Sequence, residues 1–183
     1  FHSWDSPGEL EELIPEVLRQ LPGFSEDEDE SMAFSKSLGG TEFNGSAWFS
    51  NKYGDREGSG ASAEKWQILS PVRQKPWGVD ALNRYVHQRY KSQQIEQAVN
   101  PGKYRSIPRP KGDQLIVYGD KVINNRNWRV SKKRIFGNND APGYLANGEI
   151  GIVVGHRRTK RRNWMPKNLE IEFSTQRGKT ISF

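Results

Sequence analysis

The stretches Asn147-Gly-Glu-Ile-Gly-Ile-Val-Val154 and Leu169-Glu-Ile-Glu-Phe173 decide the fold predicted for the second half of the chain. In both, large apolar residues alternate with polar residues or glycine, which is the pattern of a strand with one buried face. The expected inward-facing side chains are Ile150, Ile152, Val154, Leu169, Ile171 and Phe173. We therefore predict that the two segments pair and flank a loop from Gly155 to Asn168.

Three other short segments around this pair have the same strand-like character. Turn signals separate them, namely Tyr118-Gly119-Asp120, Ala146-Asn147-Gly148 and Arg177-Gly178. The five predicted strands are Gln114–Tyr118, Lys121–Asn125, Glu149–Val154, Leu169–Phe173 and Lys179–Phe183. Because five short strands fall within roughly 70 residues, we predict a small antiparallel β-barrel of the SH3-like or OB kind over residues 112–183.

An amphipathic helix is predicted at the other end of the chain, from Pro7 to Leu21. Ser6 is suited to cap it, and Glu9 completes a Ser-x-x-Glu capping box. Pro15 lies inside the pattern, where it is expected to kink the helix or delay its start. The apolar stripe consists of Leu10, Leu13, Ile14, Val17, Leu18 and Leu21. We expect this stripe to pack in the core, and the alternative is a partner-binding helix.

Residues 23–64 are rich in Gly, Ser and acidic residues, including the run Glu26-Asp-Glu-Asp-Glu30. Such a composition buries too little apolar surface to offset the entropy of ordering. We predict a long, partly disordered insertion, with anchors available at Phe43, Trp48, Phe49 and Tyr53. The acidic run is interpreted as a solvated loop, and the alternative is a DNA mimic that shields the basic half.

Order is expected to resume with a short strand from Trp66 to Leu69, which Pro71 ends, and a helix from Val79 to Gln93. A strand, a loop and a helix form half of a βαβ unit, which needs neighbouring parallel strands. A proline-containing linker follows at residues 100–111. We predict an α+β fold in which residues 1–99 form a partial α/β piece and residues 112–183 form the barrel.

Charge divides the 183 residues sharply. Residues 1–64 contain 4 Lys and Arg against 14 Asp and Glu, a net charge of −10. The remaining 24 basic and 8 acidic residues give residues 65–183 a net charge of +16. A basic region with an acidic appendage favours binding to a polyanion, and the plainer alternative is a solvated basic surface.

Two basic segments with aromatic residues lie within the predicted barrel. Guanidinium groups pair with phosphate oxygens and an indole offers a stacking face to an unpaired base, so both segments are predicted to contact single-stranded DNA. The first supplies Arg126, Asn127 and Trp128, and the second supplies Arg157, Arg158, Lys160, Arg161, Arg162 and Trp164. The alternative for the second segment is an exposed hairpin tip whose Trp164 shields the open end of the barrel.

The sequence offers little for catalysis. It has no cysteine, which excludes thiol catalysis and cysteine-ligated metals, and its three histidines (His2, His87 and His156) are scattered. Neither a phosphate-binding Gly-x-x-x-x-Gly-Lys-Ser/Thr loop nor a His-Glu-x-x-His motif is present. No stretch approaches the roughly 20 apolar residues needed to cross a bilayer. We expect a cytoplasmic protein that has no cofactor and no membrane partner and is not catalytic on its own.

Several stretches together resemble RecD-like and UvrD-like DNA helicases of superfamily 1. Gln67-Ile-Leu-Ser-Pro-Val-Arg73, followed by Gly78 and Leu82-Asn83, is similar to the family's motif IV strand and helix. Gly119-Asp-Lys-Val-Ile123 and Asn147-Gly-Glu-Ile-Gly-Ile-Val153 are similar to an SH3-like module inserted in the second RecA-like domain. The resemblance covers residues 65–183.

The resemblance implies a fragment of an ATP-dependent helicase. Such a fragment supplies single-stranded DNA binding and part of the second motor domain, while ATP and Mg bind in the parent enzyme, with its remaining domains as partners. Arg73 is the candidate for contacting nucleotide phosphates. The chain departs from the family by Lys75, where a Gly is common, and by its acidic insertion. The family's Walker A motif and arginine finger would lie outside this chain.

Two other functions stay open at this point. One is a stand-alone SH3-like or OB-type module that binds RNA or a protein partner. The other is a structural adaptor whose acidic segment docks on a basic partner.

Overall fold

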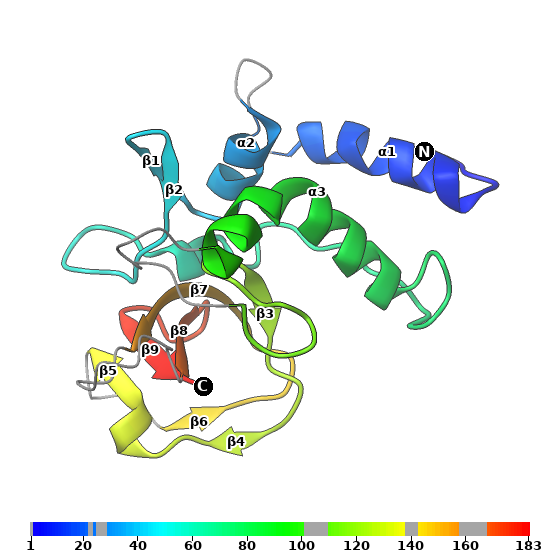
Figure 1. The fold of residues 1–183 in the computed structure, drawn as a ribbon. Helices are drawn as coiled ribbons and strands as arrows, with labels where there is room; N and C mark the ends of the chain where they lie inside the picture. The colour runs from blue at the N-terminus through cyan, green and yellow to red at the C-terminus, as the bar shows by residue number, and fades with distance from the viewer. Residues whose placement is uncertain (1, 22–23, 25–28, 101–109, 138–142, 158–167) are drawn as a thin grey trace.

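The chain adopts an α+β fold, seen in a computed structural model that describes residues 2–21, 24, 29–100, 110–137, 143–157 and 168–183 (Figure 1). Its helices are α1 (Pro7–Arg19), α2 (Glu30–Ser37) and α3 (Val79–Val99), with short 3₁₀ turns at Ser59–Ser62 and Lys132–Arg134. Its strands are β1 (Thr41–Phe43), β2 (Ser46–Trp48), β3 (Lys121–Ile123), β4 (Trp128–Arg129), β5 (Ile135–Gly137), β6 (Tyr144–Leu145), β7 (Ile150–Arg157), β8 (Asn168–Phe173) and β9 (Lys179–Ser182).

The main sheet is antiparallel, with five strands in the order β3-β7-β8-β9-β5, and two separate two-stranded ribbons are β1–β2 and β4–β6. The prediction of a closed barrel is wrong for the described residues, because β3 and β5 are three-residue edge strands that each pair on one side only. The predicted strand Gln114–Tyr118 is also wrong, since this stretch forms a turn held by an isolated bridge between Lys111 and Ile116. The other four predicted strands are confirmed to within a few residues.

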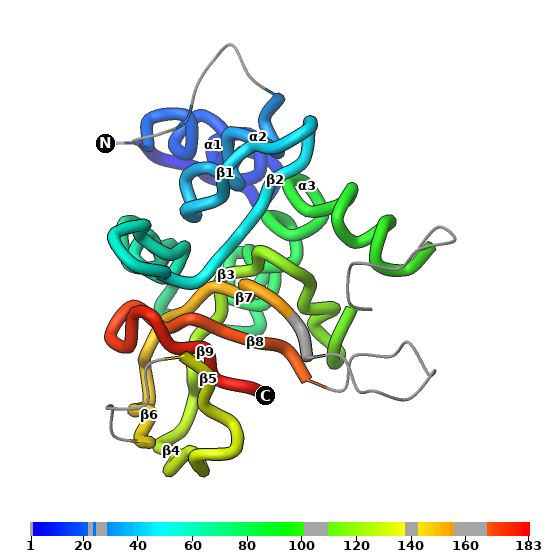
Figure 2. The backbone as a smooth tube through the Cα atoms, turned by 90° about the vertical axis from the view of Figure 1, so that its left-hand side faces the viewer, coloured from blue at the N-terminus to red at the C-terminus, as the bar shows by residue number. Residues whose placement is uncertain are grey.

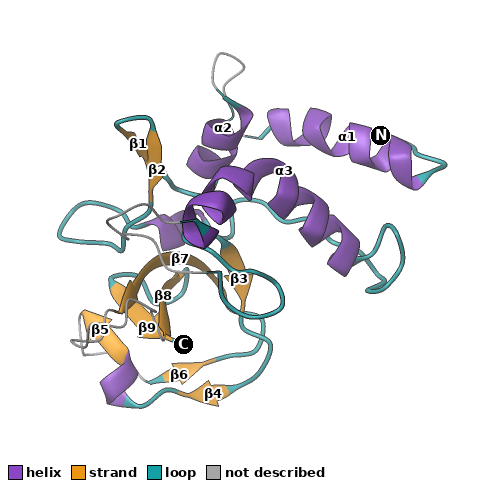
Figure 3. Cartoon of the chain, in the orientation of Figure 1, coloured by secondary structure: helices purple, strands orange, loops and turns teal. Residues whose placement is uncertain are grey.

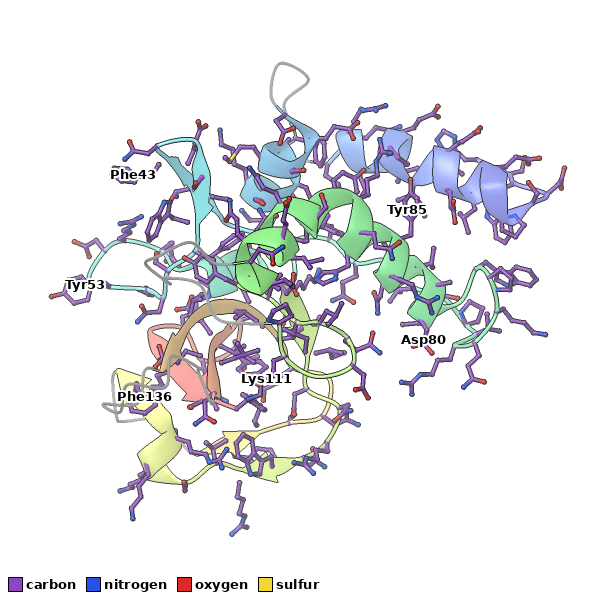
Figure 4. All side chains as sticks on the ribbon, in the orientation of Figure 1. Phe43, Tyr53, Asp80, Tyr85, Lys111 and Phe136 are labelled. Atoms are coloured by element: carbon purple, nitrogen blue, oxygen red, sulfur yellow. The ribbon has the colours of Figure 1, made fainter. Side chains whose placement is uncertain are left out.

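Helix α1 begins as predicted, with the Ser6 hydroxyl accepting a hydrogen bond from the Glu9 amide. The Glu9 carboxylate, however, accepts from the Asp5 amide rather than closing a reciprocal box on Ser6. Pro15 lies within the helix and has no N–H to offer the Glu11 carbonyl one turn earlier. The Tyr85 hydroxyl of α3 donates to that carbonyl at 2.5 Å, so the proline creates an attachment point for α3 (Figure 4).

The described part of residues 23–64 is folded, while most of the acidic run, at Glu26, Asp27 and Glu28, lies outside the described residues. It forms α2, the β1–β2 ribbon and a 3₁₀ turn, and it buries Ala33, Phe34, Leu38, Phe49 and Ala63. Of the four aromatic anchors only Phe49 is buried, while Phe43 and Tyr53 project from the edge of the molecule (Figure 4). The average composition did not predict this folding. The segment has few apolar residues, but they lie at the positions of α2 and of the chain after β2 that face the core.

Residues 66–71 form no strand, which corrects a second prediction. The indole of Trp66 packs on Phe34, but Leu69 is 85% exposed and no strand lies beside the segment among the described residues. A strand without a neighbouring strand has no partner for its backbone N–H and C=O groups, which then hydrogen-bond only to water. The predicted helix that follows is confirmed and extends to Val99.

The main sheet is covered on both faces, with the helices on one side and the β4–β6 ribbon toward the other end of the molecule (Figures 1 and 3). Ile150 and Ile152 of β7 join the cluster built by the helices, whereas Val153 and the apolar residues of β8 join a second cluster with Ile181. The predicted single inward face is therefore split between two clusters. A sheet buried on both faces has apolar residues pointing each way, and alternation alone does not tell which side each strand favours.

Buried polar contacts fasten the helical part onto the sheet. Lys91 of α3 is 2% exposed and donates from Nζ to the Gly119 carbonyl at 3.1 Å, while His87 one turn earlier lies 2.9 Å from Asp120. Gly119 has φ +81°, and a Cβ there would lie 2.2 Å from the Phe49 ring, so the turn requires glycine.

The Glu172 carboxylate on β8 is fully buried and accepts hydrogen bonds from the amides of Lys52, Gly60 and Gly178 at 2.7 to 2.9 Å. It joins the loop after β2 to the sheet.

Candidate nucleic-acid interface

The first predicted basic segment surrounds β4 and the 3₁₀ turn after it. Its five cationic side chains are all exposed; they are Arg126, Arg129, Lys132, Lys133 and Arg134. We call this set the β4 cationic face. In two views at right angles, β4 and β6 lie at the end of the molecule opposite α1 and α2 (Figures 1 and 2). The β4 cationic face thus lies away from the acidic N-terminal helices.

None of these five cations forms an ion pair with an acidic side chain in the described part of the chain. Acidic groups of the sheet are held elsewhere. Asp120 contacts His87, Glu172 is enclosed by amides, and Glu149 accepts from the Ala146 amide and the Thr175 hydroxyl. Cations without carboxylate partners are available to phosphate oxygens.

The loop that carries Arg126 is fixed by asparagines. The buried Asn124 amide donates to the carbonyls of Arg126 and Ala146 at 2.5 and 2.6 Å. Asn127, predicted to contact DNA, instead uses Oδ1 to accept from the Asn147 amide at 2.9 Å. The contact of Asn127 with nucleic acid stays a prediction, whereas Arg126 is exposed on a braced loop.

Trp128 faces the interior more than the prediction assumed. Its ring packs against Phe183 with centroids 4.9 Å apart, and the Arg134 guanidinium lies over it at 5.6 Å. On the neighbouring strand its partner is the fully buried Leu145. The indole therefore completes the second apolar cluster, and its role in stacking with a base stays a prediction.

The second predicted segment falls outside what the structure describes. This applies to the side chains of Arg157, Arg158, Lys160, Arg161, Arg162 and Trp164. The chain rejoins β8 at Asn168, and the next residue, Leu169, exchanges two backbone hydrogen bonds with Phe183. The ring of Phe183 also packs against Trp128.

Two cationic side chains contact backbone oxygens at the end of β9. Lys111 donates from Nζ to the backbone oxygen of Phe183 at 2.6 Å, and Arg134 donates to that of Ser182 at 3.4 Å. Burial lowers the pKa of Lys111, and the neighbouring Arg134 guanidinium lowers it further. The Arg134 guanidinium thus adds positive potential at the Lys111 ammonium.

Arg73, the candidate for contacting a nucleotide, lies apart from this face. Its guanidinium is 78% exposed and is 3.3 Å from the Asp80 carboxylate at the start of α3. Figure 4 places Asp80 at the far end of that helix from the strands. The structure does not bring Arg73 together with the β4 cationic face, and its role stays a prediction.

Sequence reasoning missed one aromatic residue of this region. Tyr144 on β6 is 44% exposed and lies directly opposite Arg129 in the ribbon. The alternation of apolar and basic residues in Trp128-Arg129-Val130 could have indicated that Arg129 points outward. A residue paired with Arg129 across the ribbon points to the same side, and that residue is Tyr144.

Comparison of the chain with models of protein families, with curated proteins and with solved structures gave no match. In the described ranges no helix is long and apolar enough to span a membrane. Those ranges also contain no group of three or more potential metal-ligating side chains.

Proposed function

We propose that this chain binds single-stranded DNA through the β4 cationic face, as one part of an ATP-dependent DNA helicase. The observation that carries the proposal is a set of five exposed cations at one end of the fold that have no carboxylate partner among the described residues. Contacts from Arg and Lys to the phosphate backbone make binding tolerant of sequence and sensitive to salt. Base edges are not needed for such binding.

The helicase part of the proposal rests on the sequence resemblance of Gly119–Ile123 and Asn147–Val153, whereas the motif IV strand expected at residues 66–69 does not form. Asp120 holds the turn before β3 by accepting from the Val117 amide at 2.7 Å. Glu149 likewise braces the turn before β7 through the Ala146 amide at 2.7 Å. In this proposal residues 112–183 form an SH3-like module, residues 1–99 belong to a RecA-like domain, and ATP and Mg bind to other parts of the parent enzyme.

A matched pair of triple variants tests the DNA-binding part. The first is Arg126→Ala, Arg129→Ala and Lys132→Ala, and the control is Arg19→Ala, Lys36→Ala and Lys52→Ala, which removes the same charge from ion-paired positions. Fluorescence anisotropy with labelled oligo-dT over a series of salt concentrations gives the affinity and its salt dependence.

We expect the first variant to reduce the slope of log K against log salt by about 2, because each lost phosphate contact on a single strand removes about 0.7. The control is expected to keep the slope of the unmodified chain. Equal slopes for both variants would remove the β4 cationic face as the binding surface. Parallel titration with oligo-rU compares DNA with RNA.

A further inference from the structure

The β4–β6 ribbon sorts its side chains cleanly between its two faces. Trp128 and Leu145 are cross-strand partners on the face that packs into the core. Arg129 and Tyr144 are the next pair, and both are exposed. Since neighbouring residues of a strand point to opposite faces, a guanidinium and a phenol ring lie side by side on the outer face.

The backbone under Tyr144 is held firmly. The Gly143 carbonyl accepts from the Val130 amide at 2.6 Å, and the Tyr144 carbonyl accepts from the Gln176 side-chain amide at 2.8 Å. The ring itself has no aromatic contact among the described residues. It is a braced aromatic side chain with an open face beside an exposed cation.

Such a pair matches one nucleotide of a single strand. A base stacks on an aromatic face whatever its identity, and the adjoining phosphate pairs with a guanidinium. Trp128 is half-buried and its ring contacts Phe183 and the Arg134 guanidinium, so the Tyr144 ring is the more exposed of the two. A duplex keeps its bases stacked on each other, so it gains only the phosphate contact.

Resting on the proposed function, we propose that Tyr144 is the base-stacking residue of the interface, with Arg129 holding the phosphate next to the stacked base. The site therefore selects unpaired strands over duplexes. The other cations of the β4 cationic face contribute charge along the bound DNA strand, while Tyr144 discriminates between single strands and duplexes.

The test compares Tyr144→Ala with Tyr144→Phe, which keeps the ring, in titrations with oligo-dT and with a blunt-ended duplex of equal length. Loss of one stacking contact is expected to weaken oligo-dT binding about 5- to 150-fold in Tyr144→Ala. Tyr144→Phe is expected to bind within about twofold of the unmodified chain, because the stacking face is retained. Duplex binding is expected to be the same in all three proteins.

Thermal unfolding midpoints of the two variants confirm that each is folded before titration. If Tyr144→Ala binds oligo-dT as tightly as the unmodified chain while the triple cationic variant does not, the stacking role is wrong and the charged interface stands. If neither change matters, the proposed function itself fails. An equal loss for oligo-dT and duplex would assign Tyr144 to backbone contact and overturn its role in selecting single strands.

Discussion

Basic side chains in the helical half and at the β4 end of the molecule differ in how many of them pair with a carboxylate. In the helical half, five lie within 3.5 Å of a carboxylate; they are Arg19, Lys36, Lys52, Arg73 and Arg89. Four other exposed basic residues of that half have no such partner among the described residues; they are Arg56, Lys65, Lys75 and Arg84. At the other end, the five residues of the β4 cationic face have no such partner among the described residues. Exposed ion pairs and unpaired surface charges both contribute little to stability, but only the unpaired charges leave their potential for a ligand.

The comparison predicts that stability and DNA binding depend on separate sets of charged residues. The predictions below test this separation from the largest expected effect on stability to the smallest.

Glu172→Gln is expected to lower the free energy of unfolding by about 2 to 4 kcal/mol. The carboxylate accepts three backbone amides in a fully buried position, and a glutamine places an NH₂ group against at least one of these donors. Urea denaturation measures the change. Glu42→Gln, at the exposed ion pair with Lys36, is the control and is expected to change stability by about 1 kcal/mol or less. Equal effects of the two changes would contradict a structural role for the buried carboxylate.

Lys91→Met is expected to flatten the dependence of stability on pH between about 8 and 10. Burial lowers the pKa of Lys91 to about 8, although Asp120 opposes this, so the unfolded chain binds the extra proton in this range. Lys91 therefore makes stability rise with pH there, by at most about 1.4 kcal/mol per pH unit. Above pH 10 the trend reverses, because burial raises the pKa of Tyr118 and Tyr90, and the unfolded chain ionises first.

Urea midpoints at pH 7, 8, 9 and 10 measure the effect of Lys91. Lys121→Met is a useful comparison, since burial also lowers the pKa of Lys121 to about 8. In each single variant, stability is expected to rise less steeply with pH than in the unmodified chain. If the stability of the unmodified chain did not change between pH 8 and 10, burial would lower the pKa of neither lysine.

Glu30→Gln is expected to have the smallest effect on stability, about 1 kcal/mol or less. The carboxylate contacts Arg19 of α1 at 2.6 Å and Arg89 of α3 at 2.8 Å, and the hydrogen bond from Arg19 is the main cause that lowers the pKa of Glu30. All three side chains are well exposed, so water and salt screen the pairs. Oligo-dT affinity is expected to stay unchanged, and a large loss of affinity in this variant would break the proposed separation.

Local pattern predicted four strands of the sheet, the N-terminal capped helix and α3. It failed for residues 29–64, where α2 and Phe49 fold because the core offers them apolar partners, not because their own composition is hydrophobic. It failed again for residues 66–71, since a strand needs a neighbour and the described structure provides none.

Similar reasons limited the prediction of the interface. The sequence identified Arg126 and Trp128 as basic and aromatic neighbours, but it did not predict which side chain points toward the core and which toward solvent. Pairing of β4 with β6 turns Trp128 inward and brings Tyr144 beside Arg129, which lies fifteen residues earlier in the chain.

The order of amino acids alone determined the segregation of charge, the caps and turns, and the alternation that makes the strands, because each of these depends on residues a few positions apart. Only the tertiary structure decided which face of β7 meets the helices, where Glu172 finds its amides and which aromatic ring stays open to a ligand. Those outcomes depend on contacts between residues up to 120 positions apart in the chain, and no local pattern contains the identity of the distant partner.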